Sequence, residues 1–190
     1  MIVLASQSPR RTRLLSMLGI PHEVVPADLD ETPRPGEAPE ALADRLAREK
    51  ALAVFADRPD ALVLAADTVV ALGDEMLGKP ESPADAEAIL ARLGGREHRV
   101  ITAVALAHRG GVGARTDVTR VTFRPLDADT IRAYVATGEP LDKAGAYGLQ
   151  GYGGVLVDRI EGDCFGVIGL PIRLVADLLA EAGAPYRFAR

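Results

Sequence analysis

The stretch ALVLAADTVVALGDEML, residues 61–77, decides the fold of this chain. Its first part, ALVLAAD (residues 61–67), is an apolar run that ends in a carboxylate, as expected of a buried strand. Gly73 and Asp74 then interrupt the apolar pattern and predict a tight turn between two paired strands. A buried strand that leads into a hairpin indicates antiparallel pairing in the middle of the sheet.

Strand and helix signals alternate on both sides of this stretch. Upstream we expect a strand at residues 2–5, a helix from Ser8 and Pro9 to about Gly19, a strand followed by a loop across residues 26–38, and a helix at residues 39–56. Downstream we expect a helix from Ser82 to the Gly94–Gly95 pair, strands at residues 98–107 and 116–123, a helix at residues 127–137, a glycine-rich loop, a strand at residues 155–160 and a final helix from Pro171. This order predicts an α/β protein with a mixed twisted sheet flanked by helices.

Length and composition predict one globular domain over residues 1–190. The chain is 48% hydrophobic and 26% charged, which is ordinary for a folded protein. Its net charge of -5 lacks the basic footprint of proteins that bind a nucleic-acid polymer. A small polyanion stays open as a partner, because a local cluster of arginines and lysines can attract it.

Targeting and cysteine signals are sparse. The N-terminus MIVLASQSPRR has no secretory or acylation pattern, and no apolar run reaches membrane-spanning length. These features predict a cytoplasmic protein without a membrane partner. The one cysteine, Cys164, has no disulfide partner in the chain, and we expect it to be a small core residue.

The segment SQSPRR, residues 6–11, joins the first strand to the first helix. The N-terminus of a helix offers unpaired N–H groups to an anion. Ser6 and Ser8 add hydroxyl groups, and Arg10 and Arg11 add guanidinium groups suited to phosphate oxygens. The alternative is that Ser8 only caps a helix that carries exposed arginines.

Asp67 follows the apolar run LVLAA, at the carboxyl end of the predicted strand, where open sheets place their ligands. A carboxylate there could bind a metal ion, activate water, or do both. The alternative is that Asp67 is a turn former at the end of the strand.

Lys50 falls between Leu46 and Val54 on the apolar face of the helix at residues 39–56, whereas Arg45 and Arg48 fall outside that face. An inward ammonium group needs a partner, and either a bound phosphate or Asp67 would supply the charge. The alternative is that the lysine stem runs along the apolar surface to solvent.

Two further groups would suit a triphosphate. Lys79, in the GKP sequence after the hairpin, precedes a proline that restricts its backbone. Glu31 and Asp30, in the acidic loop, would complete a site for magnesium or manganese, which prefer hard oxygen ligands. An exposed turn lysine and a solvated acidic loop are the alternatives.

The block DKAGAYGLQGYGG, residues 142–154, is rich in glycine, which permits close approach to a flat ligand. Its Gln150 carries a carboxamide whose adjacent donor and acceptor match the N3–H and O4 of uracil or thymine. The alternative is a loop glutamine that faces water. The three histidines, His22, His98 and His108, have no ligand spacing, and we assign them no chemistry.

Together these motifs resemble the Maf-like nucleoside triphosphate pyrophosphatases, also called septum formation proteins. The resemblance covers nearly the whole chain and rests on LASQSPRR, LAREKA, ADTVV, LGKP, HRVITAV, EPLDKAGAYGLQG and GLP. It implies a fold similar to that of inosine triphosphate pyrophosphatases, with two lobes around a cleft. It also implies dependence on a divalent metal cation (Mg²⁺ or Mn²⁺), a small-molecule nucleoside triphosphate as partner and, in many members, a homodimer.

Site residues carry over by position in the matching motifs. Asp67 matches the family's proton acceptor, and Arg10, Thr68 and Gln150 match its substrate-selecting positions. The family's other polar cleft residues are matched by Ser8, Arg11, Glu31, Lys50 and Lys79. Two departures concern substrate preference rather than chemistry: Ala66 stands where glycine is common, and CFGV replaces a more polar or aromatic stretch.

The DKAGAYGLQG block resembles the branch that acts on dTTP and UTP as a house-cleaning activity. The branch that acts on 7-methyl-GTP has an acidic residue in place of the glutamine. A 7-methyl-GTP or other modified purine triphosphate pyrophosphatase is therefore one alternative function. A regulator of septum formation that binds a nucleotide without turnover is the other.

The mechanism that these expectations describe begins with a metal ion that bridges triphosphate oxygens and is held by Glu31 and Asp67. Asp67 then deprotonates a water aimed at the α phosphorus. Pyrophosphate leaves while the cationic side chains neutralise the growing charge. Those side chains are Arg10, Arg11, Lys50 and Lys79.

Overall fold

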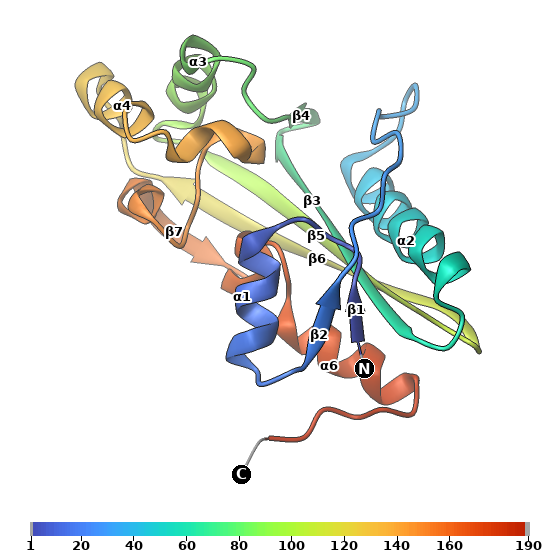
Figure 1. The fold of residues 1–190 in the computed structure, drawn as a ribbon. Coiled ribbons are helices and arrows are strands. Elements are labelled where there is room, and N and C mark those ends of the chain that lie inside the picture. The colour runs from blue at the N-terminus through green and yellow to red at the C-terminus, as the bar shows by residue number, and fades with distance from the viewer. Residues whose placement is uncertain (1, 189–190) are drawn as a thin grey trace.

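The structure, a computed structural model, describes residues 2–188, so the predicted domain ends at residues 1 and 190 lie outside the described residues. A seven-stranded mixed sheet runs through the molecule in the order β2-β1-β3-β5-β6-β7, with β4 paired to β3 (Figure 1). The predicted class, a mixed sheet flanked by helices, is confirmed.

One half of the sheet is parallel. The strands β1 (Ile2–Leu4) and β2 (His22–Val24) pair in parallel, and β1 also pairs in parallel with β3 (Leu62–Leu72). The connections between them are α1 (Pro9–Met17) and α2 (Pro39–Asp57). Both helices begin with proline, which is pre-organised for a first turn.

The other half of the sheet is antiparallel. It joins β3, β4 (Glu75–Leu77), β5 (Glu97–His108), β6 (Gly111–Phe123) and β7 (Val157–Glu161). The two-residue turn at Gly73 and Asp74 is present, and Gly73 has a φ of 64° that suits such hairpins. The remaining helices are α3 (Pro83–Leu93), α4 (Ala128–Val135), α5 (Cys164–Ile168) and α6 (Ile172–Glu181), with short 3₁₀ turns at Glu139–Asp142, Ala144–Ala146 and Tyr152–Leu156.

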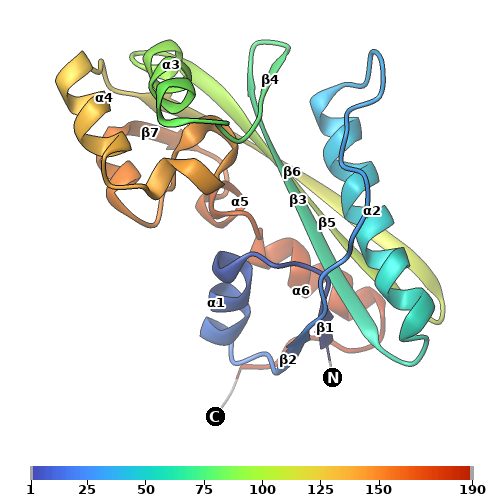
Figure 2. The same ribbon diagram turned by 45° about the horizontal axis from the view of Figure 1, so that its top comes forward.

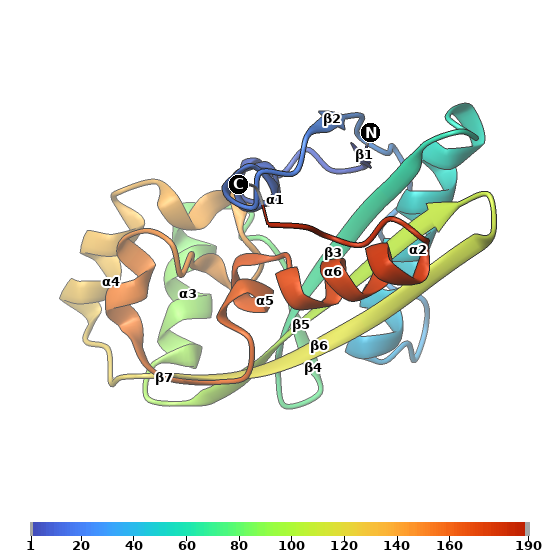
Figure 3. The same ribbon diagram turned by 90° about the horizontal axis from the view of Figure 1, so that it is seen from below.

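Side chains of β3 alternate between the two faces of the sheet. Val63, Ala65 and Val69 pack against α2, which lies along one face (Figure 2). On the other face, Leu64 belongs to a cluster with α1 and α6, and Val70 belongs to a second cluster with α3 and α4. Figure 3 shows α6 along the long strands, with α3 and α4 gathered at their far end.

These two clusters form two lobes at opposite ends of one face. We call the cluster around α1 and α6 the first lobe, and the cluster around α3 and α4 the second lobe. Thr68 lies on β3 between Ala66 of the first lobe and Val70 of the second. The predicted two-lobed arrangement is therefore present.

The pairing of β3 is interrupted on one edge. Leu4 at the end of β1 lies opposite Leu64, and β4 pairs with β3 only from Val70 onward. Within the sheet formed by residues 2–188, residues 65–69 thus have a strand neighbour, β5, on one side only. The chain leaves β1 at Ala5, whose N–H donates to the Leu64 carbonyl at 2.8 Å, and turns into α1.

This geometry corrects the predicted position of Asp67. Asp67 is not at the end of a strand but near the middle of β3, because the strand continues into the hairpin. It lies instead beyond the carboxyl end of the shorter neighbour β1. The turn-former alternative is thereby excluded.

Three smaller expectations also differ. The strand predicted at residues 155–160 begins at Val157, because Leu156 closes a 3₁₀ turn. The helix α5 was not expected; Asp163 caps it by accepting from the Phe165 N–H at 2.8 Å. The prediction that Cys164 fills the core is wrong, since this first residue of α5 is exposed.

Of the helices among residues 2–188, none has the length and apolar character needed to cross a lipid bilayer.

His98 is a buried titratable group in the second lobe. Its side chain lies edge-to-face against Phe123, and its Nε2 lies 2.9 Å from the hydroxyl oxygen of Tyr147. Its Nδ1 has no hydrogen-bond partner within residues 2–188. Burial lowers the pKa of His98 to about 4.

We predict that His98 makes the fold sensitive to acid. The unfolded chain binds a proton at His98 as the pH falls through 6.5, whereas the folded chain resists protonation until about pH 4. The free energy of unfolding should therefore fall by about 3 kcal/mol as the pH drops across that window. Urea unfolding at pH 7, 5.5 and 4.5 measures this slope, and His98→Gln should flatten it. Equal slopes in the two proteins would show that other groups cause the acid sensitivity.

Candidate active site

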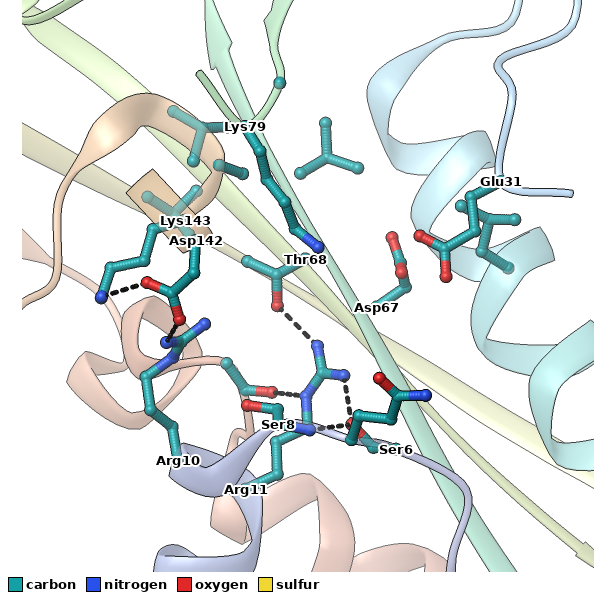
Figure 4. Close-up of a pocket in the computed structure, with 18 of the residues that line it drawn as sticks. Ser6, Ser8, Arg10, Arg11, Glu31, Asp67, Thr68, Lys79, Asp142 and Lys143 are labelled. Carbon is teal, nitrogen blue, oxygen red and sulfur yellow. Dashed lines mark hydrogen bonds and ion pairs between the residues drawn. The ribbon is translucent and has the colours of Figure 1, made fainter. Parts of the chain in front are cut away.

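A cleft of about 920 Å³ opens at the interrupted edge of β3. This volume suits a small ligand. Its lining includes every candidate site residue that the sequence motifs single out, apart from Asp30: Ser6, Ser8, Arg10, Arg11, Glu31, Lys50, Asp67, Thr68, Lys79 and Gln150. Figure 4 shows the labelled members of this set converging from β3, α1, the loop before α2 and the segment after β4.

Lys50 is the inward lysine that its helix face predicts. It is buried, and its Nζ lies 2.6 Å from Asp67 Oδ1 and 2.7 Å from Glu31 Oε1. Asp67 is also buried, so each charge of this pair has its counter-charge within contact distance. Of the two partners expected for Lys50, a bound phosphate or Asp67, the structure shows a contact with Asp67. The alternative in which the lysine stem runs along the apolar surface to solvent is excluded.

The carboxylates of Glu31 and Asp67 offer the oxygen ligands that a hard divalent cation requires. Glu31 and Asp67 come from different segments and converge on one cationic nitrogen, so a second cation could share the same oxygens. Among residues 2–188, no group of three or more histidine, cysteine, aspartate or glutamate side chains could hold a metal ion. Asp30 does not line the cleft, and its carboxylate instead accepts from the Thr32 N–H at 2.9 Å.

Arg11 joins three segments through its guanidinium. Its Nε donates to the Gly169 carbonyl at 2.8 Å, one terminal nitrogen donates to Ser6 Oγ at 3.0 Å, and the other donates to Thr68 Oγ1 at 3.2 Å. Burial lowers the pKa of Arg11, and the carboxylate of Asp67 opposes this effect. Arg11 thus holds α1, β3 and the end of α5 together (Figure 4).

Ser8 occupies the N-cap position of α1 but does not cap it. Its side chain makes no capping hydrogen bond, whereas its N–H donates to Ser6 Oγ at 3.2 Å. Ser8 is therefore the N-cap residue by position, as the alternative expects, but its side chain does not make the capping hydrogen bond. The Ser8 side chain remains available to a ligand in the cleft.

Arg10 connects α1 to the glycine-rich block. Its guanidinium lies 3.0 Å from Asp142 Oδ2, and Lys143 contacts the same carboxylate at 2.5 Å. Two cations therefore share one anion at this wall of the cleft, which leaves a net positive charge. Asp142 and Lys143 were not singled out in the sequence, although both lie in the block that carries Gln150.

Lys79 differs from the other cations of the cleft. Within residues 2–188, no carboxylate lies within ion-pair distance of its Nζ, and its side chain is directed into the cleft (Figure 4). Its charge is therefore available to a ligand. Lys79 is exposed, as the turn-lysine alternative expects, and it also lines the cleft.

The loop that carries Gln150 is fixed from behind by Glu139. The Glu139 carboxylate accepts from the backbone N–H groups of Tyr152 at 2.9 Å and Gly153 at 3.0 Å, and from the Tyr134 hydroxyl at 2.8 Å. Burial acts to raise the pKa of Glu139, but these donors outweigh it and the pKa lies below its ordinary value. A side chain at Gly151 would collide with this carboxylate.

The family of the chain follows from a comparison with known proteins. A family model described as Maf-like protein matches residues 1–182. The chain belongs to the Maf family. This result confirms the resemblance that the motifs indicated, and the matched region includes every residue of the cleft described above.

Curated relatives that match nearly the whole chain have the name dTTP/UTP pyrophosphatase, among them the following two. The protein of Myxococcus xanthus is 54% identical over 187 residues, which cover 97% of this chain and 94% of that protein. The protein of Moorella thermoacetica is 54% identical over 184 residues, covering 96% and 95%. Among solved structures, a nucleoside-triphosphatase, dITP/XTP pyrophosphatase, from Mycobacterium abscessus has a TM-score of 0.48 at 16% identity, covering 96% of this chain and 94% of that chain.

We predict that Lys50 stabilises the fold through its two carboxylates. Lys50→Ala should lower the free energy of unfolding by about 3 kcal/mol, because it removes the ammonium group that contacts both the buried Asp67 and Glu31. Arg48→Ala removes the same charge from the same helix, but its pair with Asp44 is partly exposed, and we expect a loss of about 0.5 kcal/mol or less. Urea unfolding at pH 7 compares the two variants. Equal losses would contradict the role assigned to the buried pair.

Proposed function

We propose that this protein is a nucleoside triphosphate pyrophosphatase that hydrolyses dTTP and UTP to the nucleoside monophosphate and pyrophosphate. The observation that carries the proposal is the buried Asp67, held by Lys50 inside a cleft that Lys79 enters without a carboxylate partner among residues 2–188. The relatives named dTTP/UTP pyrophosphatase, which match nearly the whole chain, support the choice of substrate. A house-cleaning role, in which unwanted triphosphates are removed, belongs to the same proposal.

Asp67 has the surroundings of a general base. One carboxylate oxygen contacts the Lys50 ammonium group at 2.6 Å, and this contact fixes the orientation of the side chain. The other oxygen can then orient a water molecule and accept its proton as the water attacks the α phosphorus. A pure nucleotide sensor would need the cations of the cleft but would not need this base.

The cations of the cleft suit the phosphate groups of the substrate. Among residues 2–188, Lys79 has no carboxylate within ion-pair distance, whereas Arg10, which lines the same cleft, is paired with Asp142. We expect these groups to neutralise the charge that develops on pyrophosphate as it leaves. Arg11 acts differently, because three of its hydrogen bonds already go to protein groups.

A divalent cation, Mg²⁺ or Mn²⁺, is the cofactor that we propose. Glu31 and Asp67 would hold it, with substrate phosphates and water as the remaining ligands, since magnesium is commonly bound through one or two carboxylates. When bound, such an ion withdraws charge from phosphate oxygens and so favours attack at phosphorus. The Lys50 ammonium group contacts both Glu31 and Asp67 and so keeps these two carboxylates close together.

The location and assembly of the protein extend this proposal. We infer that the enzyme acts in the cytoplasm, because its nucleoside triphosphate substrates are made and used there. We also propose a homodimer, which the family resemblance implies. Light scattering of the purified protein tests the assembly directly.

The central experiment is hydrolysis of a panel of triphosphates by the purified protein with magnesium, followed by detection of pyrophosphate. We expect release from UTP and dTTP. Turnover of 7-methyl-GTP alone would support the modified-purine alternative. Tight binding of a nucleotide without pyrophosphate release would support the regulator of septum formation.

The first prediction on catalysis concerns the proton acceptor. Asp67→Asn should keep the fold and nucleotide binding but lower turnover at least about a hundredfold, the usual scale for a lost general base. The amide has nearly the same shape and cannot accept the proton. Thermal unfolding and binding of a non-hydrolysable analogue are the controls. Near-normal turnover would make Asp67 a structural residue only.

The second prediction concerns the base. Gln150 lines the cleft, and its carboxamide can pair with O4 and N3–H of uracil or thymine. Gln150→Glu removes the donor to O4 and introduces a charge that prefers the paired donors of guanine. We expect kcat/KM for UTP and dTTP to fall about tenfold to a hundredfold relative to GTP. If the ratios stayed constant while overall activity changed, Gln150 would shape the loop without contacting the base.

A further inference from the structure

A chain of hydroxyl hydrogen bonds runs from the cleft into the core behind it. Thr68 Oγ1 lies 3.0 Å from Thr102 Oγ1, which lies 2.8 Å from the carbonyl oxygen of Gly166. The two threonines are register partners on β3 and β5. Thr68 lines the cleft, whereas Thr102 is fully buried and does not line it.

The chemistry of these groups fixes which one donates in each hydrogen bond. A carbonyl oxygen only accepts, so the one O–H of Thr102 donates to the Gly166 carbonyl. Thr102 Oγ1 can then only accept, and Thr68 must be the donor between the two threonines. The proton of Thr68 is therefore directed into the core, away from the cleft.

Thr68 keeps one free acceptor position. A hydroxyl group has one donor and two acceptor lone pairs. Arg11 only donates, and its contact with Thr68 Oγ1 at 3.2 Å uses one lone pair (Figure 4). The remaining lone pair is what Thr68 can offer to a ligand. A hydroxyl group can usually rotate to donate or to accept, and here the chain through Thr102 removes that choice.

To distinguish uracil from cytosine, the cleft needs a group that can act only as a donor or only as an acceptor. The carboxamide of Gln150 is not such a group. Gln150 is exposed at the cleft, and its carboxamide can turn by half a rotation to exchange its donor and acceptor. In one orientation the amide matches O4 and N3–H of uracil. In the other orientation it matches the amino group and the bare N3 of cytosine. Gln150 alone therefore cannot separate UTP from CTP.

We propose that Thr102 is a positioning residue for base selection. By accepting a hydrogen bond from the Thr68 hydroxyl, Thr102 makes Thr68 a permanent acceptor toward the base. This oxygen receives the N3–H of uracil or thymine, alone or shared with the Gln150 oxygen, and repels the N3 lone pair of cytosine. The inference rests on the proposed function and adds to it the group that excludes CTP.

The test is Thr102→Val, which removes the acceptor and leaves the Thr68 proton free to turn into the cleft. We expect the ratio of kcat/KM for UTP to that for CTP to fall about tenfold, the scale of one mismatched hydrogen bond. Thr102→Ser restores the hydroxyl and should restore the ratio. Thr119→Val is the matched control, because Thr119 is an equally buried threonine whose hydroxyl donates to Asp117 instead.

The outcomes separate the inference from the proposed function. An unchanged ratio in a folded Thr102→Val protein, with only a lower melting temperature, would overturn the inference and leave Thr102 as a core residue that holds α5. Equal use of UTP and CTP by the wild type would also overturn it. Failure of the wild type to release pyrophosphate from UTP and dTTP would instead refute the proposed function. If Thr102→Val does not fold, Thr102→Ala removes the same hydroxyl without placing a methyl group against the Gly166 carbonyl.

Discussion

The interrupted pairing along one edge of β3 is the constraint on which the site depends. β1 ends opposite Leu64 and β4 ends opposite Val70, so the part of β3 between these two residues borders the cleft rather than another strand. Residues there can carry polar side chains without breaking the core. The buried carboxylate of Asp67 still requires a counter-charge, and α2 supplies Lys50 at 2.6 Å. The ion pair and the gap in the sheet therefore belong together.

The sequence predicts those parts of the site that follow a local period or a local motif. Lys50 could be placed because its helix buries every third or fourth residue, and Asp67 because an apolar run precedes it. The position of Asp67 within its strand was predicted wrongly, since the apolar run continues into the hairpin and gives no sign of where β1 stops. The length of a strand follows from the pattern of its own residues. The point where its pairing ends depends on a neighbouring strand that is distant in the sequence.

Other parts of the site could not be predicted, because the contacts that define them join residues far apart in the chain. Arg11 reaches Gly169, and Thr102 reaches Gly166. Both contacts depend on α5, a five-residue helix too short to give a periodic signal. Glu139 is similar: three donors from two segments, α4 and the turn at Tyr152–Leu156, converge on it, and its sequence context shows only a turn. The shape of the glycine-rich loop is thus set by a carboxylate outside the loop.

The residue that we propose for catalysis and the residue that we propose for base selection are consecutive in β3. Consecutive residues of a strand face opposite sides of the sheet, so Asp67 lies on the side of Lys50 and α2, and Thr68 lies on the side of Thr102 and α5. Both side chains reach one cleft because the strand edge beside them is open. Their supporting contacts share no residue apart from β3 itself. A substitution behind Thr68 can therefore alter which base is accepted without displacing the carboxylate that we propose as the proton acceptor, and a fold of this kind can change its substrate while it keeps its chemistry.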